Sequence, residues 1–283
     1  MNLRKSAHRP VTPWHSVKSS ELVEIRGVCF DIDDTLSTHG KLTSDAYASL
    51  WALNDAGFRL VAITGRPAGW CDHFARFWPV DGVVGENGAF SFYMSGSRRE
   101  RINTPGGPVR HLESPVGLRA PELAHLAMKI KSRFPDAKWA SDQNYREYDL
   151  AIDFCEDVKC WPAPRVEALL DMCKKEGAHA KLSSIHVNSW FGDYDKFKGF
   201  LSFLNSAQIK RLPPAHQWIF IGDSPNDEPV FAQFQYSVGV ANLKPFLNRI
   251  TSPPRWITKS DSGTGFTEVA KKLILGRRLR RTR

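Results

Sequence analysis

The chain has 283 residues, of which 42% are hydrophobic and 24% charged, and its formal net charge is +9. This composition excludes a disordered, collagen-like or coiled-coil protein, and no run of about 18 apolar residues indicates a membrane helix. The N-terminus lacks an apolar block of signal-peptide length, so we expect a cytoplasmic protein. Residues 1–20 and 271–283 hold eleven basic residues and no acidic one, which leaves residues 21–270 at −2. This distribution favours two solvated basic tails over a nucleic-acid-binding surface.

Five cysteines are scattered along the chain: Cys29, Cys71, Cys155, Cys160 and Cys173. None forms a C-x-x-C pair, so neither a zinc site nor a disulfide framework is indicated. Cys155 and Cys160 lie five residues apart with no nearby histidine. We expect them, like the other three, to be reduced thiols.

Strand-like and helix-like segments alternate in the first ninety residues. Apolar, β-branched runs predict strands, and apolar residues at helical spacing predict the helices between them. In chain order these are a strand at 23–32, a helix at 44–57, a strand at 58–65, a helix at 67–78 and a strand at 81–90. The same alternation returns later, with strands at 217–223, 236–242 and 255–258 and helices at 227–234 and 266–275. Such alternation predicts a Rossmann-like, doubly wound parallel sheet.

The middle of the chain has a different pattern. Residues 96–115 are rich in Gly, Pro and Arg and are expected to form a loop. Two helices are predicted at about 120–133 and 163–176, and two alternating strands at 145–154 and 180–191. Because alternation indicates a strand with one solvated face, we expect an open antiparallel sheet here.

This change of pattern predicts a two-domain organisation with short tails. Residues 21–90 and 191–273 would form the core, and residues 91–190 an inserted α+β domain. Residues 1–20 and 274–283 would be the basic tails.

Polar side chains gather where the predicted core strands end, which is where ligands bind in sheets of this kind. The groups are Asp31, Asp33, Asp34 and Thr35, then Thr64 and Arg66, then Lys196 and Lys198, and finally Asp223 and Asp227. Neighbouring carboxylates repel one another, and a bound divalent cation would relieve that repulsion. For Asp34 we favour a turn or capping role, and Gly222 allows a tight turn before Asp223.

The order of these four groups resembles that of the haloacid dehalogenase (HAD) superfamily of phosphatases over most of residues 24–272. Three further segments, ENGA at 86–89, SVGVAN at 237–242 and GTGFTEVAKKL at 263–273, are similar to one branch of that superfamily. This branch carries a large α/β cap and includes Cof-type and sucrose-phosphate phosphatases. The chain departs from the pattern at Leu243, where alanine is more usual, in its duplicated lysine and in its basic tails.

The resemblance implies chemistry for the two acidic groups. Asp31 would be the nucleophile that forms an aspartyl-phosphate, and Asp33 would protonate the leaving group and later deprotonate water. Mg²⁺ is the implied cofactor, because it prefers hard oxygen ligands. Its implied ligands are Asp31, the backbone carbonyl of Asp33, Asp223 and Asp227.

The resemblance also implies that Thr64 and a lysine hold the phosphate oxygens. The family lysine is usually followed by glycine, which favours Lys198 because Gly199 comes next. Spacing alone leaves Lys196 open as the alternative.

The expected function is Mg²⁺-dependent hydrolysis of a small phosphorylated metabolite, such as a sugar or polyol phosphate. Four residues are weaker candidates for substrate contact, since each has a structural alternative as an ion pair, a turn cap or a buried polar group: Arg66, Asn87, His186 and Asn188. A sugar phosphomutase of the same fold shares all the core residues and stays open as an alternative. A nucleic-acid-associated phosphatase anchored by the tails is disfavoured by the slightly acidic body, and the sequence does not indicate an oligomeric state.

Overall fold

A computed structural model describes residues 10–106, 121–206 and 212–281. The chain divides into two compact units, each described by itself below. The first unit comprises Met1–Ile63, Trp78–Gly82 and Leu204–Arg283, and the second comprises Thr64–Phe77 and Val83–Phe203. Among the helices in the described ranges, none combines the length and apolarity that a membrane crossing requires.

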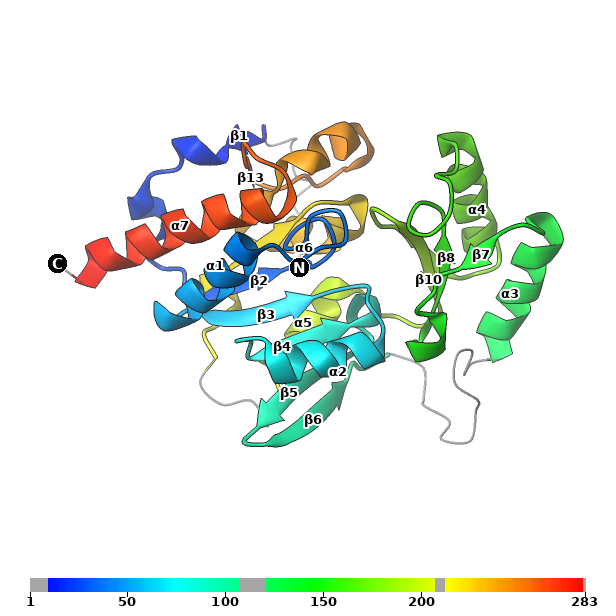
Figure 1. The fold of residues 1–283 in the computed structure, drawn as a ribbon, viewed down its shortest axis with the longest axis horizontal. Coiled ribbons are helices and arrows are strands. Elements are labelled where there is room, and N and C mark those ends of the chain that lie inside the picture. Colours follow the sequence, from blue (N-terminus) through cyan, green and yellow to red (C-terminus); the bar gives the residue numbers. More distant parts are fainter. Residues whose placement is uncertain (1–9, 107–120, 207–211, 282–283) are drawn as a thin grey trace, which may run out of the picture. The chain divides into compact units, whose positions relative to one another are not determined.

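The first unit is built on a parallel sheet (Figure 1). Its strands lie in the order β1 (Thr12–Pro13), β13 (Trp256–Ile257), β12 (Tyr236–Gly239), β11 (Trp218–Gly222), β2 (Gly27–Phe30) and β3 (Arg59–Ile63). Every residue of β2 and β11 is buried, as expected for apolar strands covered on both faces. This arrangement confirms the predicted parallel α/β sheet.

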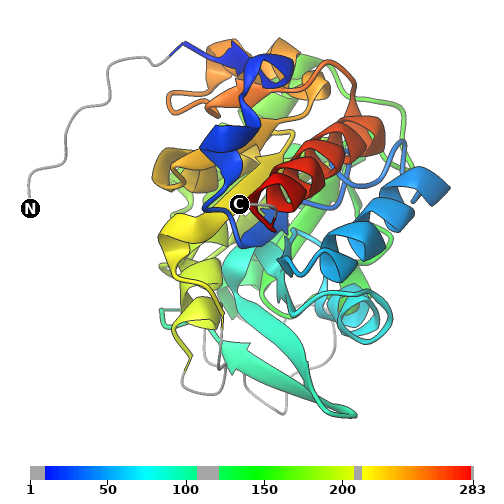
Figure 2. The same cartoon turned by 90° about the vertical axis from the view of Figure 1, so that its left-hand side faces the viewer.

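Helices α1 (Ser44–Asp55) and α7 (Ser262–Arg281) lie alongside one another in the first unit (Figure 2). Helix α1 begins after Thr43, whose hydroxyl oxygen accepts the backbone N–H of Ala46 as an N-cap. Phe266 of α7 meets Phe30 of β2 edge to face, with ring centroids 5.3 Å apart. A third helix, α6 (Glu228–Gln233), joins β11 to β12.

The chain ends differ from the two solvated tails that the charge distribution predicted. Residues 1–9 lie outside the described part, but β1 pairs with β13 and Trp14 is buried. The Lys272 ammonium donates hydrogen bonds to the backbone oxygens of Trp14, His15 and Val17. Helix α7 continues to Arg281, so most of the predicted C-terminal tail is helical. Apolar packing of Trp14 thus outweighs the basic character of the segment around it.

The second unit contains the antiparallel strands β4 (Gly82–Gly85), β5 (Phe90–Ser95) and β6 (Arg98–Asn103), with helices α2 (Ala68–Phe77) and α5 (Lys196–Leu204). The predicted loop at 96–115 is therefore wrong over β6, while residues 107–115 lie outside the described part. Arg99 and Arg101 place their guanidinium groups over the ring of Phe92, at 4.0 and 5.3 Å from its centroid. Charged residues can thus line a strand by stacking on aromatic side chains.

A second sheet of this unit is antiparallel, as predicted, in the order β7 (Lys138–Trp139), β8 (Asp149–Asp153), β10 (His186–Trp190) and β9 (His179–Leu182). Helices α3 (Pro121–Arg133) and α4 (Ala163–Lys175) supply apolar side chains to a core that includes Leu150, Ile152 and Val187. The single strand predicted at 180–191 is two strands, because Ser183 forms a turn in which its N–H donates to the backbone oxygen of His186.

The expectation of a solvated face on this sheet is wrong for β8 and β10, where every residue is buried. In the register of this pair, His186 lies opposite Asp153 and Trp190 opposite Asp149. Asp149, Asp153, His186 and Asn188 alternate with apolar residues, but their side chains make buried polar contacts instead of facing water. Alternation alone does not distinguish the two environments.

A further correction concerns the cysteines. Cys155 and Cys160 form a disulfide, with their Cα atoms 4.1 Å apart. The turn that follows β8 brings them together, which their spacing alone did not show. Cys29, Cys71 and Cys173 are free, as expected, and all three are buried.

Candidate active site

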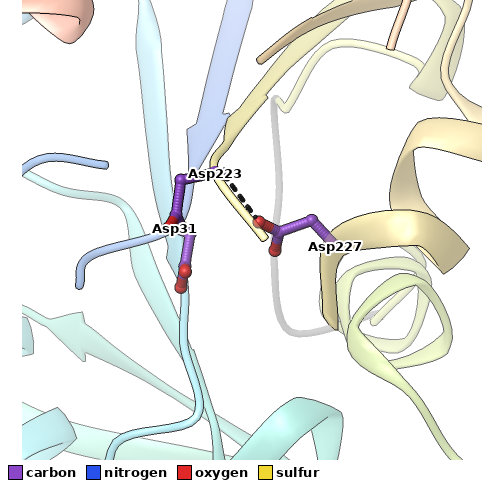
Figure 3. Close-up of side chains that lie close together, drawn as sticks. All are labelled: Asp31, Asp223 and Asp227. Atoms are coloured by element: carbon purple, nitrogen blue, oxygen red, sulfur yellow. Dashed lines mark hydrogen bonds between the residues drawn. The ribbon is translucent and has the colours of Figure 1, made fainter. Parts of the chain in front are cut away.

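Three buried carboxylates meet in the first unit, at the ends of two neighbouring strands (Figure 3). Asp31 directly follows β2 and Asp223 directly follows β11, while Asp227 ends a short 3₁₀ turn, Pro225–Asp227. One oxygen from each carboxylate lies within 4.8 Å of the others. The N–H of Asp31 donates to the backbone oxygen of Ile221, so the sheet pairing itself places the first carboxylate beside the second.

The orientation of Asp223 is set by two polar side chains. The Thr35 hydroxyl donates to one carboxylate oxygen at 3.1 Å, and the Asn242 amide donates to the other at 3.3 Å. The same amide also donates to the backbone oxygen of Asp34. Asn242 was not among the predicted site residues, although it ends the SVGVAN segment, which was the signal available for it.

Asp227 is held by backbone groups, and this requires a glycine nearby. Its carboxylate oxygen accepts the N–H groups of Asp223 at 2.9 Å and Ser224 at 3.2 Å. A Cβ atom on Gly222 would lie 2.4 Å from that oxygen. Gly222 is therefore needed for the close approach of the carboxylate, whereas the sequence suggested a tight turn.

The donor set of this cluster suits a small hard cation. Carboxylate oxygens from three separate positions converge in a buried place, and Mg²⁺ binds through such oxygens. Asp33 lies half-buried two residues beyond Asp31. Asp34 has a φ of 52° and accepts the N–H of His39, so it serves as the turn residue expected from the sequence.

The remaining predicted residues belong to the second unit. Thr64, which follows β3 in the chain, is buried, and its hydroxyl oxygen accepts the N–H of Arg66 at 3.0 Å. The hydroxyl hydrogen of Thr64 can still be donated to another acceptor. This leaves the threonine suited to hold an anionic oxygen.

The two lysines differ sharply in environment. Lys198, the preferred candidate, has 45% of its side chain exposed and pairs its ammonium with Asp193. Lys196 is only 2% exposed at the start of α5. A buried ammonium requires anionic partners. Lys198 is exposed and already paired with an aspartate, so it is poorly suited to bind phosphate, the role preferred for it from the sequence. Lys196 is the better candidate for that role.

A buried ion-pair network surrounds the other candidates of the second unit. Arg146, with no exposed side-chain surface, donates to Asp149 at 2.9 Å. The other oxygen of Asp149 accepts the amides of Asn188 at 3.0 Å and Asn87 at 3.3 Å. Asn87 and Asn188 therefore orient a buried carboxylate whose charge Arg146 balances, a structural role that differs from the turn cap considered for Asn87.

Arg66 and His186 share a second carboxylate that the sequence did not single out. Glu156 accepts the Arg66 guanidinium at 3.0 Å and lies 2.8 Å from Nε2 of His186. Arg66 also pairs with Asp142 at 3.3 Å. The hydrogen bond from His186 and the charge of Arg66 lower the pKa of Glu156 to about 2. Arg66 thus forms the ion pairs that the sequence left open as its structural alternative.

Glu86 is the most deeply enclosed carboxylate of this network. It accepts the backbone N–H groups of Ala68, Glu147 and Tyr148, and so joins the start of α2 to the segment before β8. Burial, followed by the nearby Asp149 carboxylate, raises the pKa of Glu86 to about 8. Glu86 lies in the ENGA segment quoted above, but its partners are distant in sequence.

No protein-family model and no curated protein matches the chain. Solved structures do match. A Thermoplasma acidophilum protein aligns with a TM-score of 0.67 at 16% identity, covering 89% of this chain and 99% of that one. The sucrose-phosphatase of Synechocystis sp. PCC6803, solved with sucrose and phosphate, aligns with a TM-score of 0.56 at 17% identity, over 87% and 97% of the two chains.

A third similar structure is the HAD subclass IIB sugar phosphatase BT4131, with a TM-score of 0.58, 15% identity and coverage of 87% and 98%. A fourth, the HAD superfamily phosphatase BT1666 from Bacteroides thetaiotaomicron, aligns with a TM-score of 0.58 at 18% identity over 88% and 95% of the two chains. The chain therefore has the mixed α/β fold of HAD superfamily phosphatases, as the resemblance in the sequence implied.

Proposed function

We propose that this protein is a Mg²⁺-dependent phosphomonoesterase that acts on a sugar or polyol phosphate. The observation that carries the proposal is the buried cluster of Asp31, Asp223 and Asp227 at the ends of β2 and β11. The fold supports it, because the similar structures include a sugar phosphatase and a sucrose-phosphatase. The choice of a sugar or polyol phosphate rests on those neighbours and on the expectation from the sequence.

In this proposal the protein's own side chains carry the phosphoryl group. The Asp31 carboxylate attacks phosphorus and forms an aspartyl-phosphate, while Asp33 gives a proton to the leaving alkoxide. Asp33 then takes a proton from the water that attacks the aspartyl-phosphate, which restores Asp31 and releases phosphate. Thr64 and Lys196 would hold phosphate oxygens. Mg²⁺, held by the three clustered carboxylates and the Asp33 carbonyl, would neutralise the charge on the transferring group.

A phosphate-release screen over sugar, polyol and glycerate phosphates with Mg²⁺ tests the proposal. We expect release from at least one of these substrates, and Asp31→Asn should abolish it, because an amide cannot attack phosphorus. Asp34→Asn is the matched control, since Asp34 lies three residues along the chain and serves as a turn residue. Interconversion of sugar-phosphate isomers without phosphate release would indicate a mutase. Near-normal activity of Asp31→Asn would exclude the aspartyl-phosphate mechanism.

A further inference from the structure

A short disulfide-closed loop follows β8 in the second unit. Cys155 and Cys160 close it, and Glu156 is the first residue inside it. Cys155 is half-buried, whereas Cys160 is exposed. A thiol in solution can therefore reach the disulfide from the side of Cys160.

The loop is fastened to the sheet at its first residues. The buried Asp153 carboxylate accepts the backbone N–H groups of Cys155 at 3.0 Å, Glu156 at 2.8 Å and Asp157 at 2.9 Å. At its far end the N–H of Trp161, the residue after Cys160, donates to the backbone oxygen of Phe154 at 2.9 Å. The disulfide spans the loop inside this hydrogen bond, and together with the Asp153 hydrogen bonds it limits the conformations open to Glu156.

Glu156 reaches from this loop to two buried groups. Arg66 and His186 have only 7% and 4% of their side chains exposed, and each contacts one oxygen of the Glu156 carboxylate. A buried guanidinium that loses part of its charge compensation is strongly destabilised. The low pKa of Glu156 keeps this carboxylate ionised through the neutral range, so its position, and not its protonation, controls the pairing.

We propose that the Cys155–Cys160 disulfide is a redox-sensitive site whose reduction by a dithiol releases Glu156 from Arg66 and His186. One thiolate of the dithiol attacks Sγ of Cys160 and forms a mixed disulfide, while Cys155 leaves as a thiolate and takes up a proton. The second thiol of the reductant then closes its own disulfide and frees Cys160. Two electrons pass from the dithiol to the protein, and two protein thiols form.

The first test counts thiols and follows backbone hydrogen exchange, with dithiothreitol as the probe. The unfolded oxidised chain should show three thiols, those of Cys29, Cys71 and Cys173, and the reduced chain five. Reduction should raise exchange at least about threefold in 64–70 and 183–190 as well as in 155–160. Segment 165–173 of α4 is the internal control and should not change. Five thiols before reduction, or faster exchange confined to 155–160, would overturn the proposal.

Two variants separate the loop from its carboxylate. The double variant Cys155→Ser/Cys160→Ser should match the reduced wild type in all three segments without any reductant. Glu156→Gln should already show the faster exchange at 64–70 and 183–190 when oxidised, and reduction should then change only 155–160. A Glu156→Gln protein that still responds at 64–70 would show that the coupling does not pass through this carboxylate.

A kinetic consequence follows that rests on the proposed function. If Arg66 positions substrate, reduction should raise KM several-fold with a smaller change in kcat, and Glu156→Gln should remove that response. Absence of all phosphatase activity would count against the proposed function alone, because thiol counts and hydrogen exchange do not depend on turnover. Normal activity with an unchanged KM on reduction would count against this kinetic consequence alone.

Discussion

Two lysines only two residues apart in the chain have opposite surroundings, and this decides which of them can bind phosphate. Lys196 is buried, whereas Lys198 pairs with Asp193 at the surface. We expect Lys196→Met to lower kcat/KM for phosphate release by about 10²-fold or more, as the loss of a charge aimed at a transition state does. Lys198→Met should change it by less than about twofold. A larger effect at Lys198 would restore the assignment based on the following glycine.

Asp33 offers a test of proton transfer at a single residue. Asp33→Asn should slow release from a sugar phosphate by about 10²-fold or more, because the alkoxide leaving group needs a proton. For p-nitrophenyl phosphate, the transfer of the phosphoryl group to Asp31 should be slowed less, since nitrophenolate leaves without needing a proton. Comparison of kcat/KM for the two substrates measures the difference. Equal losses would show that Asp33 is not the general acid.

At this scale the sequence predicted the acidic cluster but not what surrounds it. Asp31, Asp223 and Asp227 could be found because each follows a strand of the same sheet, and their role as ligands stays a prediction. Glu156 could not be found, because its partners lie far along the chain, and the SVGVAN segment was the signal available for Asn242. The glycine that follows Lys198 likewise does not indicate whether Lys196 or Lys198 is the buried lysine.

The loop after β8 makes a prediction about acid stability. The pKa of Glu156 falls from 4.5 to about 2 on folding, because of the bond from His186 and the charge of Arg66. A carboxylate with a lowered pKa stabilises the fold above about pH 4.5, and this contribution disappears as the pH falls towards 2. Glu156→Gln should therefore be less stable than the wild type near neutral pH.

Urea unfolding across this pH range measures the effect. The gap in unfolding free energy between wild type and Glu156→Gln should be constant from about pH 7 to 5 and should shrink below about pH 4. Asp171→Asn is a suitable control, since Asp171 is exposed on α4 and lies outside the buried network. A gap that does not change with pH would mean that Glu156 is not held by charged partners.

Elements differed in how well they could be predicted. Apolar strands such as β2 and β11 and the amphipathic helices were clear because burial dictates their composition. Strand β6 was missed because its sequence, RRERIN, is mostly charged and is typical of a loop. In the structure its arginines stack on aromatic rings, which the sequence does not show. The buried polar face of β8 and β10 was mistaken for a solvated one, because buried ion pairs and water favour the same residue types.

For the whole molecule, the carboxylate cluster predicts a link between metal binding and stability. Mg²⁺ at about 100 times its Kd should stabilise the native state by about 2.7 kcal/mol and raise Tm by several degrees. Asp223→Asn should lose this shift while keeping an acceptor for Thr35. Differential scanning fluorimetry with and without Mg²⁺ measures it, and the Asp34→Asn protein should respond like the wild type.

Chelation supplies the functional counterpart. EDTA should abolish phosphate release and Mg²⁺ should restore it, whereas Ca²⁺ should restore little, because its looser coordination does not hold the reacting groups in line. Full activity after exhaustive chelation would contradict the proposed role of Asp31, Asp223 and Asp227. A thermal shift without restored activity would separate metal binding from catalysis.

The pairing of β1 with β13 has a consequence for synthesis on the ribosome. Thr12 lies opposite Trp256, so the sheet of the first unit cannot be completed until Trp256 has been made. The second unit lies between these partners in the chain and is interrupted only at residues 78–82. During translation it can therefore acquire its structure while β2 still waits for β11. Helix α7, which is made after every strand of the first unit, then packs against residues 14–22, which are made before β2.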